Sequence, residues 1–241
     1  LLIGFSPDGK GDVIGTARAI PMALGGFVNA GWVLGTAGLF MASGMLSTGL
    51  EKRIALNILK VVGTKTNAIF AGVMIVMLVL DFFIPAVSAR SATMTPIAVG
   101  LISSFGVDPK SVFARMLLVT IALSSSISGI GLLSAGPPNP IAQSFIQNSL
   151  KVTVTWGDWF IYAMPYCVAL MAALYLLVTK LNKFEFAEIP GGRSVIDRSL
   201  KELGPISSRE KRISVIFIFT IILWATEAIH RIDANTVAVL S

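Results

Sequence analysis

The chain has 241 residues, of which 54% are hydrophobic and only 13% are charged, and its formal net charge is +6. Soluble domains carry about 25% charged residues, so the composition excludes an ordinary soluble domain, and the high apolar content excludes a disordered chain. One Cys and one His leave too few ligands for a zinc, haem or iron–sulfur centre. We therefore expect an all-α polytopic membrane protein, with no metal or cofactor beyond a coupling ion such as Na⁺.

The first part of the chain predicts one membrane span and an interfacial continuation. Residues 1–26 are assigned to a segment at the outer membrane edge, and the start without Met indicates a piece of a longer protein. An apolar span is expected over about 27–50, where the charged run 51–53 ends it. A short amphipathic helix over about 54–65 follows, so residues 27–66 form a transmembrane helix and an interfacial helix.

The next apolar stretch predicts a re-entrant hairpin rather than two full spans. It covers 67–105 and is interrupted at Pro85 and by the polar cluster 88–96. The second arm, counted from Ala92 to residue 105, gives only about 21 Å of helix. A bilayer core needs about 30 Å, so this arm is too short to cross it.

The following helix is predicted to be discontinuous. It is expected over about 112–128, to break at 128–131 and again at 136–140, and to resume over about 141–150. Gly and Pro clusters at membrane depth expose backbone groups, which only protein or a wet cavity can satisfy. Broken helices of this kind mark binding sites in secondary transporters, so residues 67–150 are predicted to be the transport region.

The last third of the chain predicts a transmembrane helix within 151–182, a cytoplasmic linker over 183–212 and the start of a second repeat over 213–241. The linker is expected to hold an interfacial helix from Ser194 to Leu203, and the second repeat to open with a span over about 213–229.

The basic charge is explained by topology. When these spans are placed, most of the 19 Lys and Arg residues fall on the side that holds 51–65 and 183–212, as the positive-inside rule requires of a cytoplasmic face. The expected partner is therefore the lipid bilayer and not a nucleic acid. Short loops favour a bacterial inner (plasma) membrane.

Arg90 is the strongest candidate for binding, because it lies at the polar interruption of the hairpin. A charge at the bilayer centre costs about 2.5–3.5 kcal/mol on insertion scales, so it needs a cavity, a partner or a substrate. A guanidinium can hold a carboxylate or a phosphate-like anion through two parallel hydrogen bonds. Two alternatives stay open, namely a structural ion pair with Asp81 and an Arg that reaches the membrane surface.

The hydroxyl groups of Ser88, Ser91 and Thr93 can donate to the same anion. They can also cap a helix that is expected to begin near Ala92. The two roles are compatible, because a helix N-terminus offers free amides and a positive dipole end to an anion.

The segment 124–139 is the second candidate region. Ser128, Gly129 and Gly131 suit a bent backbone whose carbonyl oxygens face inward, and such oxygens are ligands for Na⁺. A plain kinked helix explains the same residues equally well. The sequence offers no nucleophile–base pair, so we do not expect an enzyme.

Several motifs in this order resemble the divalent anion:sodium symporters, a family of di- and tricarboxylate transporters. They are a turn at 46–55 (LSTGLEKRIA), a hairpin tip from Phe83-Ile84-Pro85 to Pro96-Ile97, the run 128–139 (SGIGLLSAGPPN), and Leu203-Gly204-Pro205 with Glu210-Lys211 and Trp224. The resemblance implies one half of an inverted-repeat transporter, with a re-entrant helical hairpin and a broken transmembrane helix. It also implies a homodimer that binds its substrate between two hairpin tips.

The resemblance also implies site residues. Arg90 matches the Arg of the citrate-carrier branch, and Pro138 and Asn139 match the family's Pro-Pro-Asn element, so substrate-binding residues are expected at Ser88, Arg90, Ser91, Thr93, Pro138 and Asn139. The family's Ser-Asn-Thr triplet, whose Asn helps hold substrate and sodium, is replaced by Ala86-Val87-Ser88. The tentative cation-binding residues are Ala86, Val87, Ser128, Gly129 and Gly131.

The function expected from these features is secondary active transport of small organic anions such as succinate, malate or citrate by alternating access, coupled to sodium or by anion exchange. A carrier of an inorganic anion such as sulfate or arsenite on a related fold is the first alternative. An intramembrane enzyme and a channel or structural subunit are alternatives from other classes.

Overall fold

The computed structural model describes residues 15, 19, 30–189 and 191–241, and these residues form helices without a β-strand. This confirms the all-α prediction for the part of the chain that is described. The predicted outer segment 1–26 lies outside it, apart from Gly15 and Ala19.

The first described helices form a bent pair. Helix α2 covers Ala30–Thr48 and α3 covers Leu50–Val62, and the two meet at an angle of 70°. Gly49 lies between them with a φ of 75°, in the left-handed region that glycine adopts without strain. The interfacial helix thus begins at Leu50 and not at 54, because the chain turns at the glycine and the charged run is already helical.

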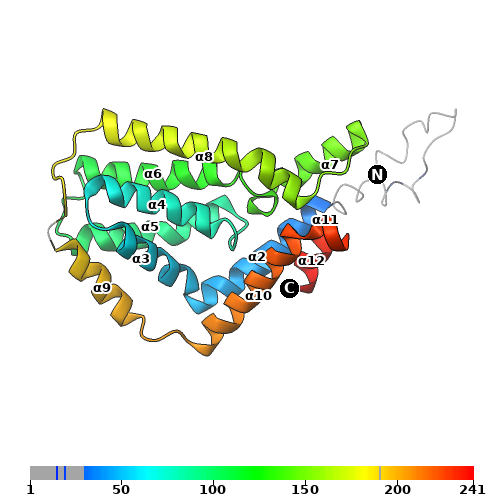
Figure 1. The fold of residues 1–241 in the computed structure, drawn as a ribbon. Coiled ribbons are helices and arrows are strands. Elements are labelled where there is room, and N and C mark those ends of the chain that lie inside the picture. The colour runs from blue at the N-terminus through cyan, green and yellow to red at the C-terminus, as the bar shows by residue number, and fades with distance from the viewer. Residues whose placement is uncertain (1–14, 16–18, 20–29, 190) are drawn as a thin grey trace.

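Four helices pack side by side as the main bundle (Figure 1). They are α4 (Thr66–Leu80), α5 (Val87–Ser104), α6 (Val112–Ser128) and α8 (Trp156–Leu181). Phe70 of α4 joins α4 to α6, because its ring meets the ring of Phe113 edge to face at 5.6 Å. The core of the bundle therefore lies between α4 and α6.

Helix α8 is the described helix that is long and apolar enough by itself to cross a membrane, with 26 residues. Helices α2 and α3 pass the same criterion only when taken together, and α4 and α6 are apolar but shorter. Thr155 and Asp158 cap the start of α8 reciprocally, which satisfies the first free amides of the helix.

Helix α5 begins five residues earlier than predicted. Ala86 is extended and accepts the first helical bond from the Arg90 amide at 3.1 Å. The polar cluster therefore lies within the helix, where Thr93 donates its hydroxyl hydrogen bond to the carbonyl of Ala89 at 2.9 Å. Eighteen residues give about 27 Å of helix, which is close to the thickness of a bilayer core. Helix length therefore does not separate a re-entrant arm from a full span, and the hairpin stays a prediction.

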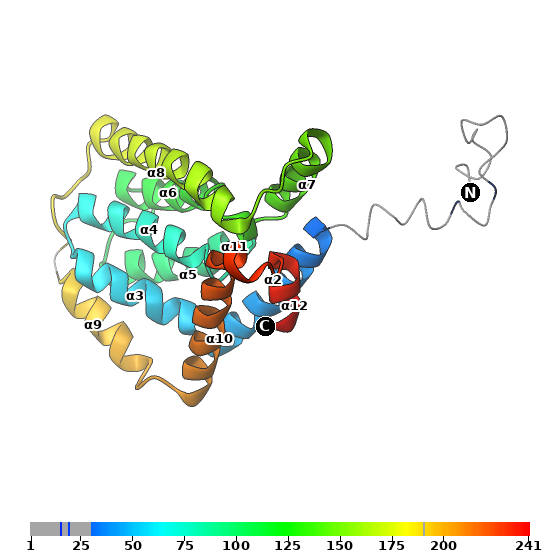
Figure 2. The same cartoon turned by 45° about the vertical axis from the view of Figure 1, so that its right-hand side comes forward.

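The predicted interruptions of the next helix coincide with helix ends. Helix α6 ends at Ser128, a single 3₁₀ turn (η3) covers Leu133–Ala135, and α7 covers Pro138–Leu150. Helix α7 starts three residues before the predicted 141, because Pro138 occupies its first turn, where a missing amide costs nothing. Helix α7 projects from the bundle (Figure 2).

The last third forms a second group of helices around α2. After α9 (Gly192–Glu202), helix α10 (Ser208–Ala225) packs with α2 and α12 (Ala234–Leu240), and the single turn α11 (Glu227–His230) joins α10 to α12. Helix α9 covers most of the stretch from Ser194 to Leu203 where a helix was predicted, and its interfacial position stays a prediction. The predicted span over 213–229 is too long, because α10 ends at Ala225 and the chain turns at Thr226.

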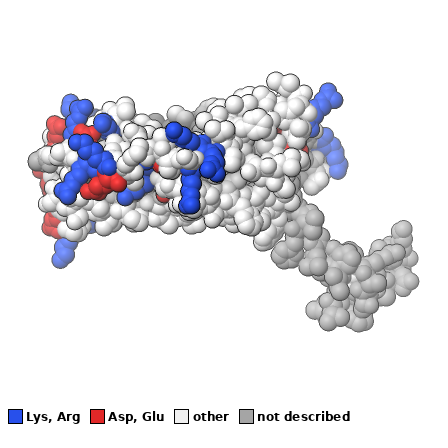
Figure 3. Space-filling model, turned by 90° about the horizontal axis from the view of Figure 1, so that it is seen from below, with Lys and Arg blue, Asp and Glu red and all other residues white. Residues whose placement is uncertain are grey.

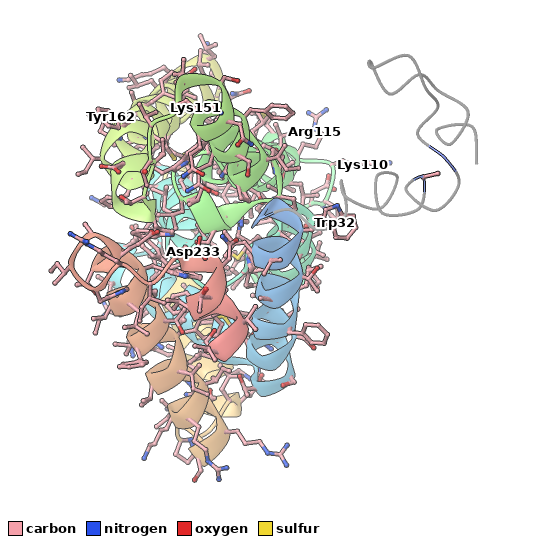
Figure 4. The ribbon with its side chains drawn as sticks, turned by 90° about the vertical axis from the view of Figure 1, so that its right-hand side faces the viewer. Trp32, Lys110, Arg115, Lys151, Tyr162 and Asp233 are labelled. Atoms are coloured by element: carbon pink, nitrogen blue, oxygen red, sulfur yellow. The ribbon has the colours of Figure 1, made fainter. Side chains whose placement is uncertain are left out.

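Charged side chains gather at few places on the surface. Figure 3 shows Lys and Arg where α9 lies and around the start of α10, with uncharged surface beside them. Elsewhere large aromatic side chains point outward, as Tyr162 of α8 and Trp32 of α2 do in Figure 4, with 80% and 51% of their surface exposed. An uncharged surface with outward aromatic groups suits contact with lipid.

Candidate functional site

The two interruptions predicted from the sequence meet in space. We call residues 81–86, between α4 and α5, the tip, and residues 129–137, between α6 and α7, the break. Arg90 lies between them and has no exposed surface. Its side chain bonds to the tip and also to the break, 45 residues further along the chain.

The guanidinium of Arg90 contacts both interruptions. Its Nε lies 2.7 Å from Oδ1 of Asp81, which is also fully buried. One terminal nitrogen donates to the carbonyl of Ile84 in the tip at 2.6 Å and to that of Ala135 in the break at 2.9 Å. The other donates to the carbonyl of Ser125 in α6 at 3.2 Å. Arg90 therefore ties the tip, the break and α6 to one charge.

This geometry bears on the readings that the sequence left open for Arg90. The ion pair with Asp81 is present, and the guanidinium does not reach the surface. A substrate carboxylate can contact Arg90 directly only after the pair with Asp81 opens. In this conformation Arg90 positions the backbone of the site.

The predicted hydroxyl groups divide into two kinds. Ser88 is exposed in the first turn of α5, and Ser91 is half-buried one turn further on, so both lie on one face of the helix. Thr93 donates to the backbone of its own helix. The first turn of α5 also has free amides, so Ser88 and Ser91 lie next to the positive end of a helix.

Asn139 closes the break from the start of α7. Its amide nitrogen donates to the carbonyls of Gly129 and Leu132, both at 2.7 Å. The neighbouring Pro138, the other residue expected from the Pro-Pro-Asn element, is exposed. Asn139 was expected to bind the substrate. In this structure its amide group instead holds the shape of the break.

The tentative cation-binding residues surround Arg90. The hydroxyl of Ser125 donates to the carbonyl of Val87 at 2.8 Å, and Ser128 donates to the carbonyl of Ser125 at 3.2 Å. The carbonyl of Ala86 accepts the Arg90 amide. These oxygens are already hydrogen-bonded within the chain, so they do not fit the ligand set of a Na⁺ ion in this conformation.

The two glycines in this set lie where a side chain would meet close neighbours. A Cβ atom at Gly129 would lie 3.1 Å from Nη2 of Arg90, and one at Gly131 would lie 2.9 Å from Cε of Met164. Contacts this close are tighter than normal carbon contacts, so a side chain at either position would displace its neighbours.

Two tryptophans and one glutamate outside the predicted site residues support the break. Trp156 donates its indole N–H to the hydroxyl of Ser134 at 3.2 Å, and Trp159 donates to the carbonyl of Ile130 at 3.1 Å. Glu227 accepts from the backbone amide of Trp156 at 2.8 Å. The signal in the sequence for these contacts is a pair of Trp residues three apart, at a helix start that follows a Gly-rich run.

Two of the motifs that carry the resemblance meet away from the tip. Arg53 of the turn at 46–55 lies 2.6 Å from the carboxylate of Glu210 in the first turn of α10. Its guanidinium also donates to the carbonyl of Gly204 at 3.0 Å. The pair joins α3 to the start of the predicted second repeat.

Comparison with known proteins gives one family. The family described as "Sodium:sulfate symporter transmembrane region" matches residues 3–241. A "Membrane protein" from Cupriavidus necator is 38% identical over 239 residues, which are 98% of this chain and 47% of that protein.

Two further relatives have names that state a substrate. The "Sodium-dependent dicarboxylate transporter SdcS" of Staphylococcus saprophyticus is 28% identical over 200 residues, which are 78% of this chain and 38% of that protein. The "Putative malate transporter YflS" of Bacillus subtilis is 28% identical over 227 residues, which are 92% of this chain and 48% of that protein. The chain thus spans about half or less of the length of these relatives. It belongs to the sodium:sulfate symporter family of integral membrane transporters, the divalent anion:sodium symporters that its motifs resemble.

Proposed function

We propose that the chain forms one half of a secondary carrier of di- and tricarboxylate anions, such as succinate, malate or citrate. The observation that carries the proposal is the junction of the tip and the break at the buried pair of Arg90 and Asp81. At this junction the first turn of α5 offers free backbone amides and the positive end of a helix to an anion. The relatives named for dicarboxylate and malate transport support the same substrate class.

The substrate site proposed for this half is the first turn of α5. The hydroxyls of Ser88 and Ser91 and the free amides of that turn donate to one carboxylate. Arg90 acts behind them by fixing the backbone, and it reaches the substrate only in a conformation in which Asp81 has moved. Pro138 and Asn139 shape the wall of the site at the start of α7. The re-entrant hairpin, the broken span and the inverted repeat are parts of this proposal.

Transport by this carrier follows alternating access, with the substrate chemically unchanged. The coupling is either sodium symport, as the name of SdcS states for that protein, or exchange of one anion for another. The oxygens near Arg90 are bonded within the chain, so this half does not offer Na⁺ a set of free ligands in this conformation. The carrier is proposed to be a homodimer in a bacterial inner membrane, with α9 on the cytoplasmic face.

An inorganic anion is the second candidate substrate, because the matching family is described by sulfate. Sulfate or arsenite would need the same donors at the first turn of α5. Recovery of the substrate distinguishes both kinds of carrier from an intramembrane enzyme, because a carrier releases its substrate chemically unaltered.

The test uses the full-length parent protein in proteoliposomes. Uptake of labelled succinate and citrate is measured with and without a sodium gradient, and with dicarboxylate inside. We expect saturable uptake, and we expect Ser88→Ala to raise KM about tenfold, because it removes a hydrogen bond to a charged group. Ser126→Ala, at an exposed serine of α6, is the matched control and leaves KM unchanged.

The outcomes separate the alternatives. Dependence on external sodium indicates symport, and dependence on internal anion alone indicates exchange. Uptake of sulfate without any carboxylate uptake would replace the proposed substrate class by inorganic anions. A Ser88→Ala variant that behaves as wild type would remove the first turn of α5 from the site.

A further inference from the structure

Helix α2 presents two glycines to the tip and the break. Gly35 and Gly38 are three residues apart, so they lie on the same face of the helix. A Cβ atom at Gly38 would overlap the ring of Pro85 in the tip, with the Pro85 Cβ at 2.9 Å and the ring Cγ closer still. A Cβ atom at Gly35 would lie 3.9 Å from Cγ of Pro137 in the break, which is an ordinary contact.

The proline ring of the tip is therefore seated in a notch that only glycine can form. Gly38 and Pro85 line a small cavity of about 10 Å³ together with Asp81 and with Ser134 of the break. The cavity is about the size of one water molecule. The contact of Gly38 with Pro85 thus covers the side of the ion pair that faces α2.

The two partners of this contact belong to different groups of helices. Helix α2 packs mainly with α7, α10 and α12, whereas the tip connects α4 and α5 of the main bundle. A ring in a notch has two arrangements, seated or withdrawn, because close-packed surfaces do not deform continuously. Separation of the two groups at this point would withdraw the ring and open the cavity at Asp81.

We propose that Gly38 is a positioning residue for transport, whose notch seats Pro85 and so holds the tip closed over the pair of Asp81 and Arg90. The inference rests on the proposed function, since it names the contact that separates two conformations of that carrier. Gly38 does not contact the substrate and acts only through Pro85.

The first test compares transport by three variants of the full-length protein, normalised to the amount of folded carrier. Gly38→Ala is expected to lower the maximal rate of succinate uptake about tenfold or more, while KM stays within about threefold of wild type. Gly35→Ala is the matched control on the same helix face and is expected to transport normally. The double variant Gly38→Ala/Pro85→Gly is expected to recover most of the rate, because glycine at position 85 removes both the ring and the Cβ atom that a Cβ at position 38 would overlap.

The second test reads the tip without transport. A cysteine is placed at Ala86, next to Pro85, and a control cysteine at the buried Ala114 of α6, both with Cys167→Ser. Gly38→Ala is expected to speed modification of the Ala86→Cys reporter by a soluble maleimide and to leave Ala114→Cys protected. Addition of Pro85→Gly, which removes both the ring and the Cβ atom, is expected to restore protection at the reporter.

The results of the two tests together support or contradict the proposed role of Gly38. If Gly38→Ala leaves both the rate and the reporter unchanged, or if it exposes Ala114→Cys equally through general unfolding, the notch is not a positioning contact. If wild type carries no anion but the reporter responds as expected, the proposed function fails and the conformational contact stands.

Discussion

A buried pair of opposite charges, Asp81 with Arg90, is the most costly contact of the candidate site. Neither side chain has exposed surface, so both have lost their hydration. Their mutual attraction and the three carbonyls around Arg90 offset this cost only while both partners are present. Removal of one partner leaves an unpaired charge in a low-dielectric interior.

The pair is therefore expected to behave as a unit in stability. Asp81→Asn and Arg90→Gln are each expected to destabilise the protein by about 3–5 kcal/mol. The double variant Asp81→Leu/Arg90→Met is expected to recover most of that loss, because two apolar groups replace two charges. Thermal or denaturant unfolding in detergent measures all three, and additive losses would contradict a coupled pair.

An exposed pair serves as the control for this cycle. Lys60 and Asp197 lie 2.7 Å apart, but their side chains are 44% and 36% exposed. Their neutralisation is expected to change stability little, because water screens the attraction.

At the scale of single residues, the sequence predicted the importance of Arg90 and offered Asp81 as one possible partner, but it could not choose between that ion pair and a ligand. A charge within an apolar stretch is visible in any sequence, because it is costly wherever it lies in the membrane. Whether it meets Asp81 or a ligand depends on the direction of the tip, which no local pattern specifies. Asp81 and Arg90 flank the tip, and only the turn between them brings them within 2.7 Å.

Among the elements, the break depends on side chains more than on its own backbone. Its carbonyls point to Asn139 and Trp159, which supply donors that a regular helix would have supplied. Every buried carbonyl needs such a donor, so the break keeps one shape only while these side chains are present.

Asn139→Ala is expected to destabilise the protein by about 1–3 kcal/mol, because it removes the side-chain donor to the carbonyl of Gly129 and one of the two donors to the carbonyl of Leu132, which also accepts from the Ala135 amide. Asn148→Ala, at an exposed position on the same helix, is the control and is expected to change stability little. Melting temperatures of the two purified variants make the comparison. Equal melting temperatures would mean that the Asn139 amide is dispensable for the break.

Helix positions were predictable where Gly and Pro interrupt an apolar run, and less so where polar residues do. The end of α6 at Ser128 follows from the glycines after it. The start of α5 was placed five residues late, since Ser and Thr side chains indicated a cap. Within α5 these hydroxyls bond back to the helix, as those of Thr93 and Thr95 do, and a sequence cannot separate the two uses.

Across the whole molecule, the linker joins helix ends that are distant in sequence. The Thr66 amide at the start of α4 donates to the carbonyl of Ala187 at 2.9 Å, and the Val112 amide at the start of α6 donates to the carboxylate of Glu185 at 2.6 Å. Charge patterning indicated that these segments share one side of the membrane. It did not indicate that the linker itself caps α4 and α6, because such caps come from tertiary contacts.

The contact of Arg53 with Glu210 is the corresponding joint to α10. Besides the carboxylate, the guanidinium contacts carbonyls at 203–205, so one side chain fixes the chain just before α10 begins. Glu210 lies in the polar first turn of α10, ahead of its apolar part, and also accepts from the amide of its N-cap, Ser207, at 2.6 Å. Both contacts favour the charged carboxylate.

These contacts predict a stability that depends on pH in the acid range. Hydrogen bonds from Arg53, then from Ser207, lower the pKa of Glu210 to about 2, whereas an unfolded Glu has a pKa of about 4.3. A depressed folded pKa means that the stabilisation is complete above about pH 4.3 and is lost as the pH falls towards about 2. Glu210→Gln should therefore melt below wild type by a constant margin from neutral pH to about pH 5, and the margin should shrink as the pH falls further. Glu202→Gln, whose partner Arg198 is 83% exposed, should show little margin at any pH. A margin for Glu210→Gln that persists unchanged at the lowest pH would mean that the joint depends on the shape of the side chain and not on its charge.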